Sequence, residues 1–189
     1  MLGEENGNRK SEIGNRKNPL FSKIRILKRI ALLSDTHNYI DTPVLKAVEG
    51  SDEIWHGGDF GSIAIVESLE GIAPLRGVYG NIDGPDIRSI YPEVNRFDCE
   101  QVNVLMIHIG GYPGKYSPLT RKMFAEKPPQ LFISGHSHIL KIIYDPLFEC
   151  LHINPGAAGK QGWHTVRTVV RFEVDGAEVK NCRIVELKR

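Results

Sequence analysis

The order of hydrophobic and polar positions in the first half of the chain predicts strands that alternate with helices. Residues 30–33 form an uninterrupted apolar run, as expected for a strand covered on both faces. A helix is expected next, because Asp41 can cap it, Pro43 suits its first turn, and apolar residues recur behind them at helical spacing. The same pattern predicts strands over residues 53–56 and 75–79 and a helix over residues 62–69. Such alternation favours a parallel sheet covered by helices.

Strands dominate the second half. Apolar runs and alternation predict strands over residues 94–99, 102–109, 131–134, 141–144, 151–153, 165–174 and 177–186. Only residues 118–126 have a helical pattern there, and Asp175-Gly176 is a strong signal for a tight hairpin. We therefore predict an α/β fold of two mixed sheets packed face to face, with helices on the outside.

Length and composition predict one domain over residues 24–189. The chain has 189 residues, of which 41% are hydrophobic, enough for one good core. Residues 1–23 are rich in Gly, Asn, Glu, Lys and Arg, a composition too polar to offset the entropy of ordering. We interpret this segment as a polar extension with no part in catalysis.

Charge and cysteine content exclude several classes of protein. Lys and Arg total 24 against 23 Asp and Glu, so we expect no specific nucleic-acid binding and no attraction to an anionic membrane. The three cysteines fit neither a disulfide framework nor a zinc-ribbon spacing. The apolar stretch over residues 24–33 is interrupted by three basic residues, so it is no membrane span. These features favour a cytoplasmic protein, and they leave room for a homo-oligomer.

The candidate chemistry falls where predicted strands end. Seven metal-competent side chains lie at these positions: Asp35, His37, Asp59, Asn81, His108, His136 and His138. Loops at the carboxyl ends of parallel strands are where α/β proteins place their sites. A mixed oxygen and nitrogen set suits manganese, iron, zinc or nickel rather than calcium. Seven groups are too many for one tetrahedral ion and are a natural number for two ions.

The spacing within the set is also informative. Residues two apart in an extended segment project to one side, so Asp35 with His37, and His136 with His138, are each expected to face a common space. The glycines beside the ligands permit unusual backbone angles where the chain must turn sharply. They are Gly57, Gly58, Gly80 and Gly135.

Together these motifs resemble those of the calcineurin-like metallophosphoesterases. That family's ordered signature is D-x-H, G-D, G-N, H and G-H-x-H. The chain has all five pieces in order: Asp35-Thr-His37, Gly58-Asp59, Gly80-Asn81, His108 and Gly135-His-Ser-His138. Each piece alone is weak evidence for the family, whereas the ordered set is strong evidence. The compact length and the turn Asn154-Pro-Gly156 resemble the small bacterial and archaeal phosphodiesterases of the family most.

The resemblance implies a four-layer sandwich and a site with two divalent ions, with manganese favoured. It places Asp35, His37, Asp59 and His138 around one ion, and Asp59, Asn81, His108 and His136 around the other, with Asp59 as the bridge. Two such ions activate a bridging hydroxide that attacks the phosphorus of a small phosphate ester. We expect Asp59, Asn81 and Asp83 to take part in catalysis.

One position departs from the family pattern. Many members have a histidine after the G-N motif, placed to protonate the leaving group, whereas this chain has Ile82. We therefore predict that aryl phosphodiesters are cleaved better than alkyl monoesters. Asp83 has two open roles, a weak acid or a partner that orients a ligand histidine. The second is favoured because carboxyl groups are ionised at neutral pH.

Other residues carry weaker signals. We interpret His56 as a buried residue behind the ligands and His152 as a packing residue. Trp163 and His164 either border the substrate cleft or pack, and packing is favoured. The loop after His108 carries a cation and two aromatics on a glycine-rich segment, which is typical of a specificity loop. The expected substrate contacts are Asn81, Gly110, Gly111, Lys115 and Tyr116.

Two other functions compete with hydrolysis of a phosphate ester. A protein-interaction scaffold is one, because the retromer's phosphoesterase-like subunit shares the family's fold but lacks some ligand residues. Here each ligand position has a competent side chain, which favours an enzyme. A metal-dependent amidohydrolase also uses His-x-His, but early in the chain, whereas here the pair comes late. The sequence does not distinguish nucleotide diesters, lipid head groups, small monoesters or phosphoprotein as substrate.

Overall fold

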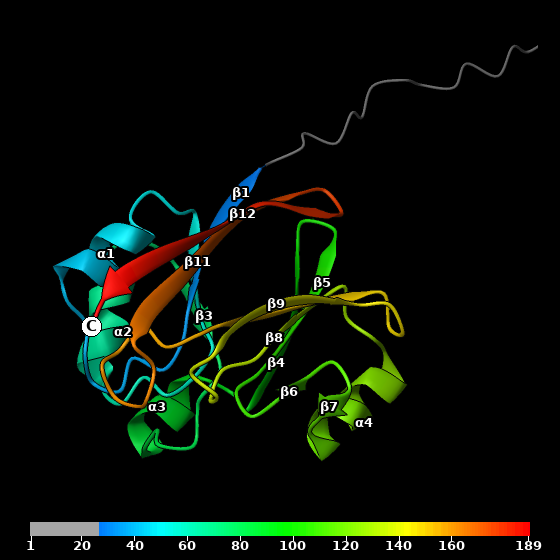
Figure 1. The fold of residues 1–189 in the computed structure, drawn as a ribbon, viewed down its shortest axis with the longest axis horizontal. Coiled ribbons are helices and arrows are strands. Elements are labelled where there is room, and N and C mark those ends of the chain that lie inside the picture. Colours follow the sequence, from blue (N-terminus) through cyan, green and yellow to red (C-terminus); the bar gives the residue numbers. More distant parts are fainter. Residues whose placement is uncertain (1–26) are drawn as a thin grey trace, which may run out of the picture.

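The computed structural model describes residues 27–189, which pack as two mixed sheets with helices outside (Figure 1). The first sheet consists, in spatial order, of β12 (Glu178–Lys188), β11 (Val166–Asp175), β1 (Lys28–Leu33), β2 (Glu53–His56) and β3 (Leu75–Gly77). The second consists of β4 (Val94–Cys99), β5 (Val102–Ile107), β8 (Leu131–Ile133), β10 (Cys150–Pro155) and β9 (Leu140–Asp145). The predicted extension over residues 1–23 lies outside the described residues.

Each sheet has parallel strands at its centre. In the first sheet β1 pairs in parallel with β2, and β2 with β3, while β11 and β12 join in antiparallel register. In the second sheet β8 lies in parallel between β5 and β10. The parallel strands therefore end in loops at one edge of each sheet, which is where a site is expected.

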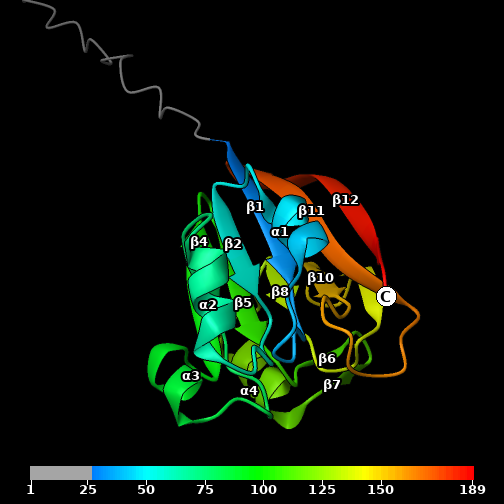
Figure 2. The same cartoon turned by 90° about the vertical axis from the view of Figure 1, so that its left-hand side faces the viewer.

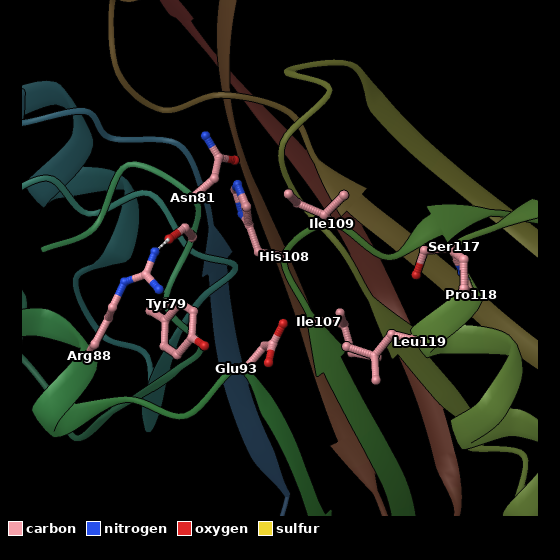
Figure 3. A pocket seen from close by; sticks show the side chains of 11 residues that line it. Tyr79, Asn81, Arg88, Glu93, Ile107, His108, Ile109, Ser117, Pro118 and Leu119 are labelled. Atoms are coloured by element: carbon pink, nitrogen blue, oxygen red, sulfur yellow. Dashed lines mark hydrogen bonds between the residues drawn. The ribbon is translucent and has the colours of Figure 1, made fainter. Parts of the chain in front are cut away.

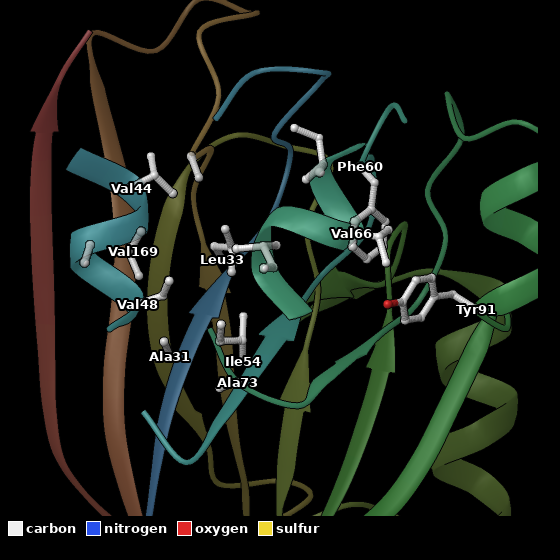
Figure 4. Close-up of a cluster of buried hydrophobic side chains, with 14 of the residues drawn as sticks. Ala31, Leu33, Val44, Val48, Ile54, Phe60, Val66, Ala73, Tyr91 and Val169 are labelled. Carbon is white, nitrogen blue, oxygen red and sulfur yellow. The ribbon is translucent and has the colours of Figure 1, made fainter. Parts of the chain in front are cut away.

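The alternation of side chains along the strands builds three apolar layers. Ile30 and Leu32 on β1 pack between the sheets, whereas Ala31 and Leu33 face the other way. Helices α1 (Thr42–Val48) and α2 (Ile63–Glu70) cover that outer face, as Figures 2 and 4 show. Helix α4 (Pro118–Glu126) covers the far side of the second sheet, where Phe124 packs on Phe132. The predicted four-layer sandwich is confirmed.

Most predicted elements are present within two residues of their expected ends. Asp41 caps α1 by accepting a hydrogen bond from the Val44 backbone N–H at 3.3 Å. The hairpin between β11 and β12 forms as predicted, with Gly176 at φ +59° in its turn. No helix among residues 27–189 has the length and apolar character needed to cross a membrane.

One helix and one hairpin of two strands were not predicted. Helix α3 (Pro85–Ile90) has six residues and buries only Ile87, so it has no apolar periodicity to reveal it. Strands β6 (Gly111–Tyr112) and β7 (Lys115–Tyr116) form a small hairpin in the segment interpreted as a loop. Its signal was the turn Pro113-Gly114, in which Gly114 has φ +84°.

Candidate metal centre

Loops from both sheets converge at one edge of the sandwich. Asp35 and His37 follow β1, Asp59 follows β2, and His108 follows β5. Backbone hydrogen bonds tie these loops together: the Asp35 N–H donates to Gly58 O at 2.9 Å, and the Gly135 N–H donates to His108 O at 3.0 Å. The packing of the two sheets thus brings together residues that lie up to a hundred positions apart.

The converging side chains form two clusters. Asp35, His37 and His138 make the first, and Asp59, His108 and His136 make the second. Within each cluster the candidate ligand atoms lie within 4.8 Å of one another. Asn81 lies beside the second cluster, and Figure 3 shows its carboxamide next to the His108 imidazole.

The Asp59 carboxylate faces histidines of both clusters. Its Oδ2 lies 3.3 Å from His108 Nε2 and 3.7 Å from His37 Nε2. Its Oδ1 accepts a hydrogen bond from the Ile82 backbone N–H at 3.1 Å, which holds the carboxylate in place. Asp35 lies close by, with Oδ1 3.2 Å from His138 Nε2 and 3.9 Å from His108 Nε2.

The local backbone is not the extended chain assumed in the spacing argument. Asp35, His37, Asp59, His136 and His138 all have positive φ, between +47° and +68°. This left-handed conformation costs side-chain-bearing residues on the order of 1 to 3 kcal/mol each and is typical of functional sites. The premise of an extended segment is therefore wrong, and His136 and His138 lie in two different clusters, both of which Asp59 faces.

Glycines allow the loops to approach one another closely. A Cβ on Gly80 would overlap the Asp59 carboxylate, and one on Gly58 would overlap the His108 ring. Gly58 also has φ +102°, which residues with a side chain rarely adopt. These two positions accept no side chain without displacing a candidate ligand.

The imidazoles are oriented as a cation would require. His108 Nδ1 lies 2.7 Å from Gly57 O, so Nδ1 carries the proton and Nε2 presents a lone pair toward Asp59. This buried Nε2 has no hydrogen-bond partner among the described residues. His37 Nε2 and His138 Nε2 lie 3.1 Å apart. A nitrogen-rich pocket with two carboxylates fits borderline divalent ions.

The pKa shifts follow from burial and from the two carboxylates. Burial lowers the pKa of His37 more than Asp59 and Asp35 raise it. Burial also opposes protonation of His108, but its contact with Asp59 and the charge of Asp35 make the net shift of its pKa upward. A hydrogen bond to Asp35 raises the pKa of His138 against the effect of burial.

Asp83 lies behind the candidate ligands and holds their loops. Its Oδ2 accepts the backbone N–H groups of Asp59 at 3.0 Å and Gly80 at 2.7 Å, and its Oδ1 accepts that of Gly61 at 2.8 Å. The side chain is buried, and both oxygens act as acceptors. This arrangement orients backbone rather than a ligand histidine, and it leaves no oxygen directed at a leaving group.

His56 is buried behind the centre, where the sequence interpretation places it. Its Nδ1 accepts the Gly58 N–H at 3.2 Å, so Nε2 donates to Thr36 Oγ1 at 3.0 Å. The ring stacks on Phe60 at 3.7 Å between centroids. Burial lowers the pKa of His56 to about 3, so the ring is neutral.

Three pockets border the two clusters. The Leu119 pocket, of about 420 Å³, is lined by Asn81, His108, Ile109 and Leu119 among others (Figure 3). The Lys141 pocket, of about 280 Å³, is lined by Ile109, Gly111, His136 and Lys141 among others. The Trp163 pocket, of about 540 Å³, lies beside His136 and His138 and includes Trp163 and His164.

The expected substrate contacts are only partly brought to these pockets. Asn81 lines the Leu119 pocket, and Gly110 and Gly111 line the Lys141 pocket. Tyr116 instead packs in the core under α4 and donates its hydroxyl to Asp145 at 2.6 Å, because the β6–β7 hairpin turns its side chain inward. Lys115 is exposed on that hairpin and lines none of the three pockets.

Some pocket residues were missed or misinterpreted. Arg88 and Glu93 line the Leu119 pocket, and only the short helix α3 and the start of β4 place them there. Trp163 is fully exposed, so the packing role favoured for it is wrong. His152 is buried as expected, with Nε2 3.0 Å from Ser134 Oγ.

Comparison with known proteins agrees with this geometry. The calcineurin-like phosphoesterase superfamily domain matches residues 29–177. A probable metallophosphoesterase of Methanothermobacter thermautotrophicus is 31% identical over 134 residues, which cover 68% of this chain and 76% of that protein.

Solved structures share the fold. A conserved uncharacterized protein of Streptococcus pneumoniae, described as a "predicted phosphoesterase", has a TM-score of 0.60 at 20% identity and covers 87% of this chain and 99% of its own. Vps29 of Chaetomium thermophilum has a TM-score of 0.66 at 15% identity and covers 85% of this chain and 97% of its own. With the family domain matched over most of its length, the chain belongs to the calcineurin-like phosphoesterase superfamily.

Proposed function

We propose that this chain is a phosphodiesterase that uses two divalent metal ions, with manganese favoured. The observation that carries the proposal is the Asp59 carboxylate, whose Oδ2 faces imidazole nitrogens of both clusters at 3.3 and 3.7 Å. Asp35, His37 and His138 would hold one ion, and Asn81, His108 and His136 the other, with Asp59 shared. When bound, such ions lower the pKa of a coordinated water and neutralise charge on the phosphoryl oxygens.

The residues of the chain prepare this site before substrate arrives. Gly57 O fixes the tautomer of His108, and the Ile82 N–H holds one oxygen of Asp59. Two carboxylates among the imidazoles supply negative charge that a pair of dications would exceed, so the loaded centre would attract a phosphate anion. The Asn81 carboxamide lies beside the His108 imidazole (Figure 3), and we propose that it binds both an ion and a phosphoryl oxygen.

Preference for esters with good leaving groups, such as aryl diesters, is supported by the absence of a proton donor at Ile82. The isoleucine side chain is 43% exposed beside the centre and has no titratable group. The buried Asp83 uses both oxygens as acceptors, so it is placed to position the loops rather than to protonate a leaving group. Esters whose leaving groups depart without protonation should therefore react fastest.

A protein-interaction scaffold is the second candidate function, and the Vps29 likeness supports it at the level of the fold. The filled ligand positions favour the enzyme. A cytoplasmic location is proposed as well, because Cys99, Cys150 and Cys182 are all unpaired.

The test combines metal content with turnover. Protein purified without chelator is analysed for bound metal and assayed on bis(4-nitrophenyl) phosphate with added manganese. Asp59→Asn should lower both metal content and turnover, whereas Asp86→Asn, which alters an exposed carboxylate on α3, should change neither. Protein that binds metal but turns over no ester in a panel of diesters and monoesters would instead support the scaffold.

A further inference from the structure

Two of the pockets meet at one residue and border the same cluster. Ile109 lines both the Leu119 pocket and the Lys141 pocket. The first pocket reaches His108 and the second reaches His136, and both histidines belong to the cluster that contains Asp59. A phosphate at this cluster would therefore have an open pocket on each side of Ile109, whose side chain is 49% exposed.

The Leu119 pocket has an apolar wall on one side and two charged residues, Arg88 and Glu93, on the other (Figure 3). Ile107, Ile109 and Leu119 form one wall of it (Figure 3). Arg88 on the other side is engaged within the fold, because its Nε donates to Asp83 O at 2.7 Å and its guanidinium lies 4.4 Å from the centre of the Tyr79 ring. The volume of about 420 Å³ falls within the range of small-molecule pockets, roughly 300 to 1,000 Å³.

The Lys141 pocket differs mainly in size. At about 280 Å³ it is smaller than the Leu119 pocket. Gly110, Gly111 and Gly135 contribute backbone to its lining, and their carbonyl oxygens already accept hydrogen bonds within the fold. Lys141 lies at its edge with Nζ 3.5 Å from the centre of the Tyr112 ring. This pocket therefore suits the smaller of two substituents.

We propose that the chain binds an unsymmetrical phosphodiester across Ile109, with the larger substituent in the Leu119 pocket and the smaller substituent in the Lys141 pocket. Ile109 is then a residue that determines specificity, since it separates the two substituents and contacts both. A phosphomonoester would fill only one pocket. The inference rests on the proposed function, because it takes the phosphate to lie at the Asp59 cluster.

Binding without turnover tests the arrangement directly. Zinc-loaded protein, which is diamagnetic, is titrated with diphenyl phosphate and with phenyl phosphate while NMR signals report each pocket. The Leu119 methyl groups report the first pocket, the Gly111 amide the second, and the Trp163 indole the third. Diphenyl phosphate should shift both Leu119 and Gly111, and phenyl phosphate only one of them.

Other outcomes overturn the inference. Three results would show that the two substituents do not lie across Ile109. The diester could shift Leu119 alone, it could shift Leu119 and Trp163 but not Gly111, or it could shift neither Leu119 nor Gly111. If the diester shifts the NMR signals of both pockets but the protein hydrolyses no ester, the binding arrangement is correct and the proposed function is wrong. Methyl phenyl phosphate tests the orientation, because nuclear Overhauser effects from its phenyl protons should reach the Leu119 methyl groups and not the Gly111 amide.

Kinetics test the role of Ile109. Ile109→Ala should lower kcat/KM for the diester by about tenfold, because apolar contact to both substituents is lost. The same variant should lower kcat/KM for 4-nitrophenyl phosphate by only about threefold, because a monoester loses the contact of one substituent. Ile90→Ala is the matched control, since Ile90 is similarly exposed, at 52%, and lines none of the three pockets. Equal losses on diester and monoester would contradict the assignment.

Discussion

Asp83 and Asp59 hold each other's loops in place through hydrogen bonds to the backbone. Asp83 Oδ2 accepts the Asp59 N–H at 3.0 Å, while Asp59 Oδ1 accepts the N–H of Ile82, the residue next to Asp83, at 3.1 Å. The loop after β2 and the loop after β3 are thereby locked as one unit. These hydrogen bonds position the Asp59 carboxylate, which faces both histidine clusters.

Replacing Asp83 by asparagine should loosen this unit. The amide puts an N–H₂ group where three backbone donors converge, which should cost about 1 to 3 kcal/mol of unfolding free energy. Misplacement of Asp59 should lower kcat/KM by roughly 10- to 100-fold. Urea denaturation and steady-state kinetics measure the two effects.

The dependence of the Asp83→Asn effect on the leaving group distinguishes a positioning role of Asp83 from proton donation. If Asp83 only positions the loops, Asp83→Asn should lower kcat/KM by the same factor for aryl and alkyl esters. If Asp83 were the general acid, the loss on alkyl esters would be larger, because those leaving groups need a proton. A loss confined to alkyl esters would contradict the structural role described above.

Two neighbouring glycines offer a matched pair. A Cβ at Gly80 would overlap the Asp59 carboxylate, whereas a Cβ at Gly84 would meet nothing within 4 Å. Gly80→Ala should therefore abolish most metal binding, and Gly84→Ala should leave it unchanged. Calorimetric titration with manganese gives the comparison. Equal affinity in both variants would show that the centre tolerates displacement of Asp59.

Two buried histidines predict how stability depends on pH. Burial lowers the pKa of His56 to about 3 and that of His152 to about 4, whereas an unfolded histidine titrates near about 6.5. Below pH 6.5 the unfolded chain binds protons that the folded chain does not. Their contribution to the unfolding free energy should therefore be steady above about pH 7 and fall toward pH 4, by up to about 1.4 kcal/mol per pH unit for each histidine. His108 and His138, whose pKa values are raised, contribute in the opposite direction.

Urea unfolding at intervals between pH 8 and pH 5 checks this slope. The measurements use chelator-treated protein so that metal binding does not contribute. His152→Gln should be less stable overall but should lose about 1.4 kcal/mol per pH unit of the slope. An unchanged slope in this variant would show that His152 is protonated in the folded protein.

The residue after Asn81 should control which leaving groups are tolerated. Ile82 is partly exposed beside the centre and donates no side-chain proton. Ile82→His should raise kcat/KM for alkyl esters by up to about 100-fold and leave nitrophenyl esters nearly unchanged. Ile82→Gln is polar and does not titrate near neutral pH, so it should show no such gain. A gain in both variants would attribute the effect to polarity rather than to proton donation.

The sequence by itself determined the strand and helix pattern and the order of the candidate ligands, because an element that buries one or both faces has a recognisable pattern of apolar residues. Residues 30–33 are all apolar because their side chains face two cores in turn, and such an uninterrupted run is visible without coordinates. The short helix α3 and the β6–β7 hairpin bury too little apolar surface to have such a pattern. They escaped prediction for that reason.

Only the tertiary structure decided how the candidate ligands group. His136 and His138 are two residues apart yet join different clusters, and both residues have left-handed backbone angles that the sequence does not reveal. The pockets depend equally on tertiary contacts: Glu93, His108 and Leu119 line one pocket because β4, β5 and α4 pack side by side. Distances between separate elements are determined by how the two sheets pack, and no local pattern encodes them.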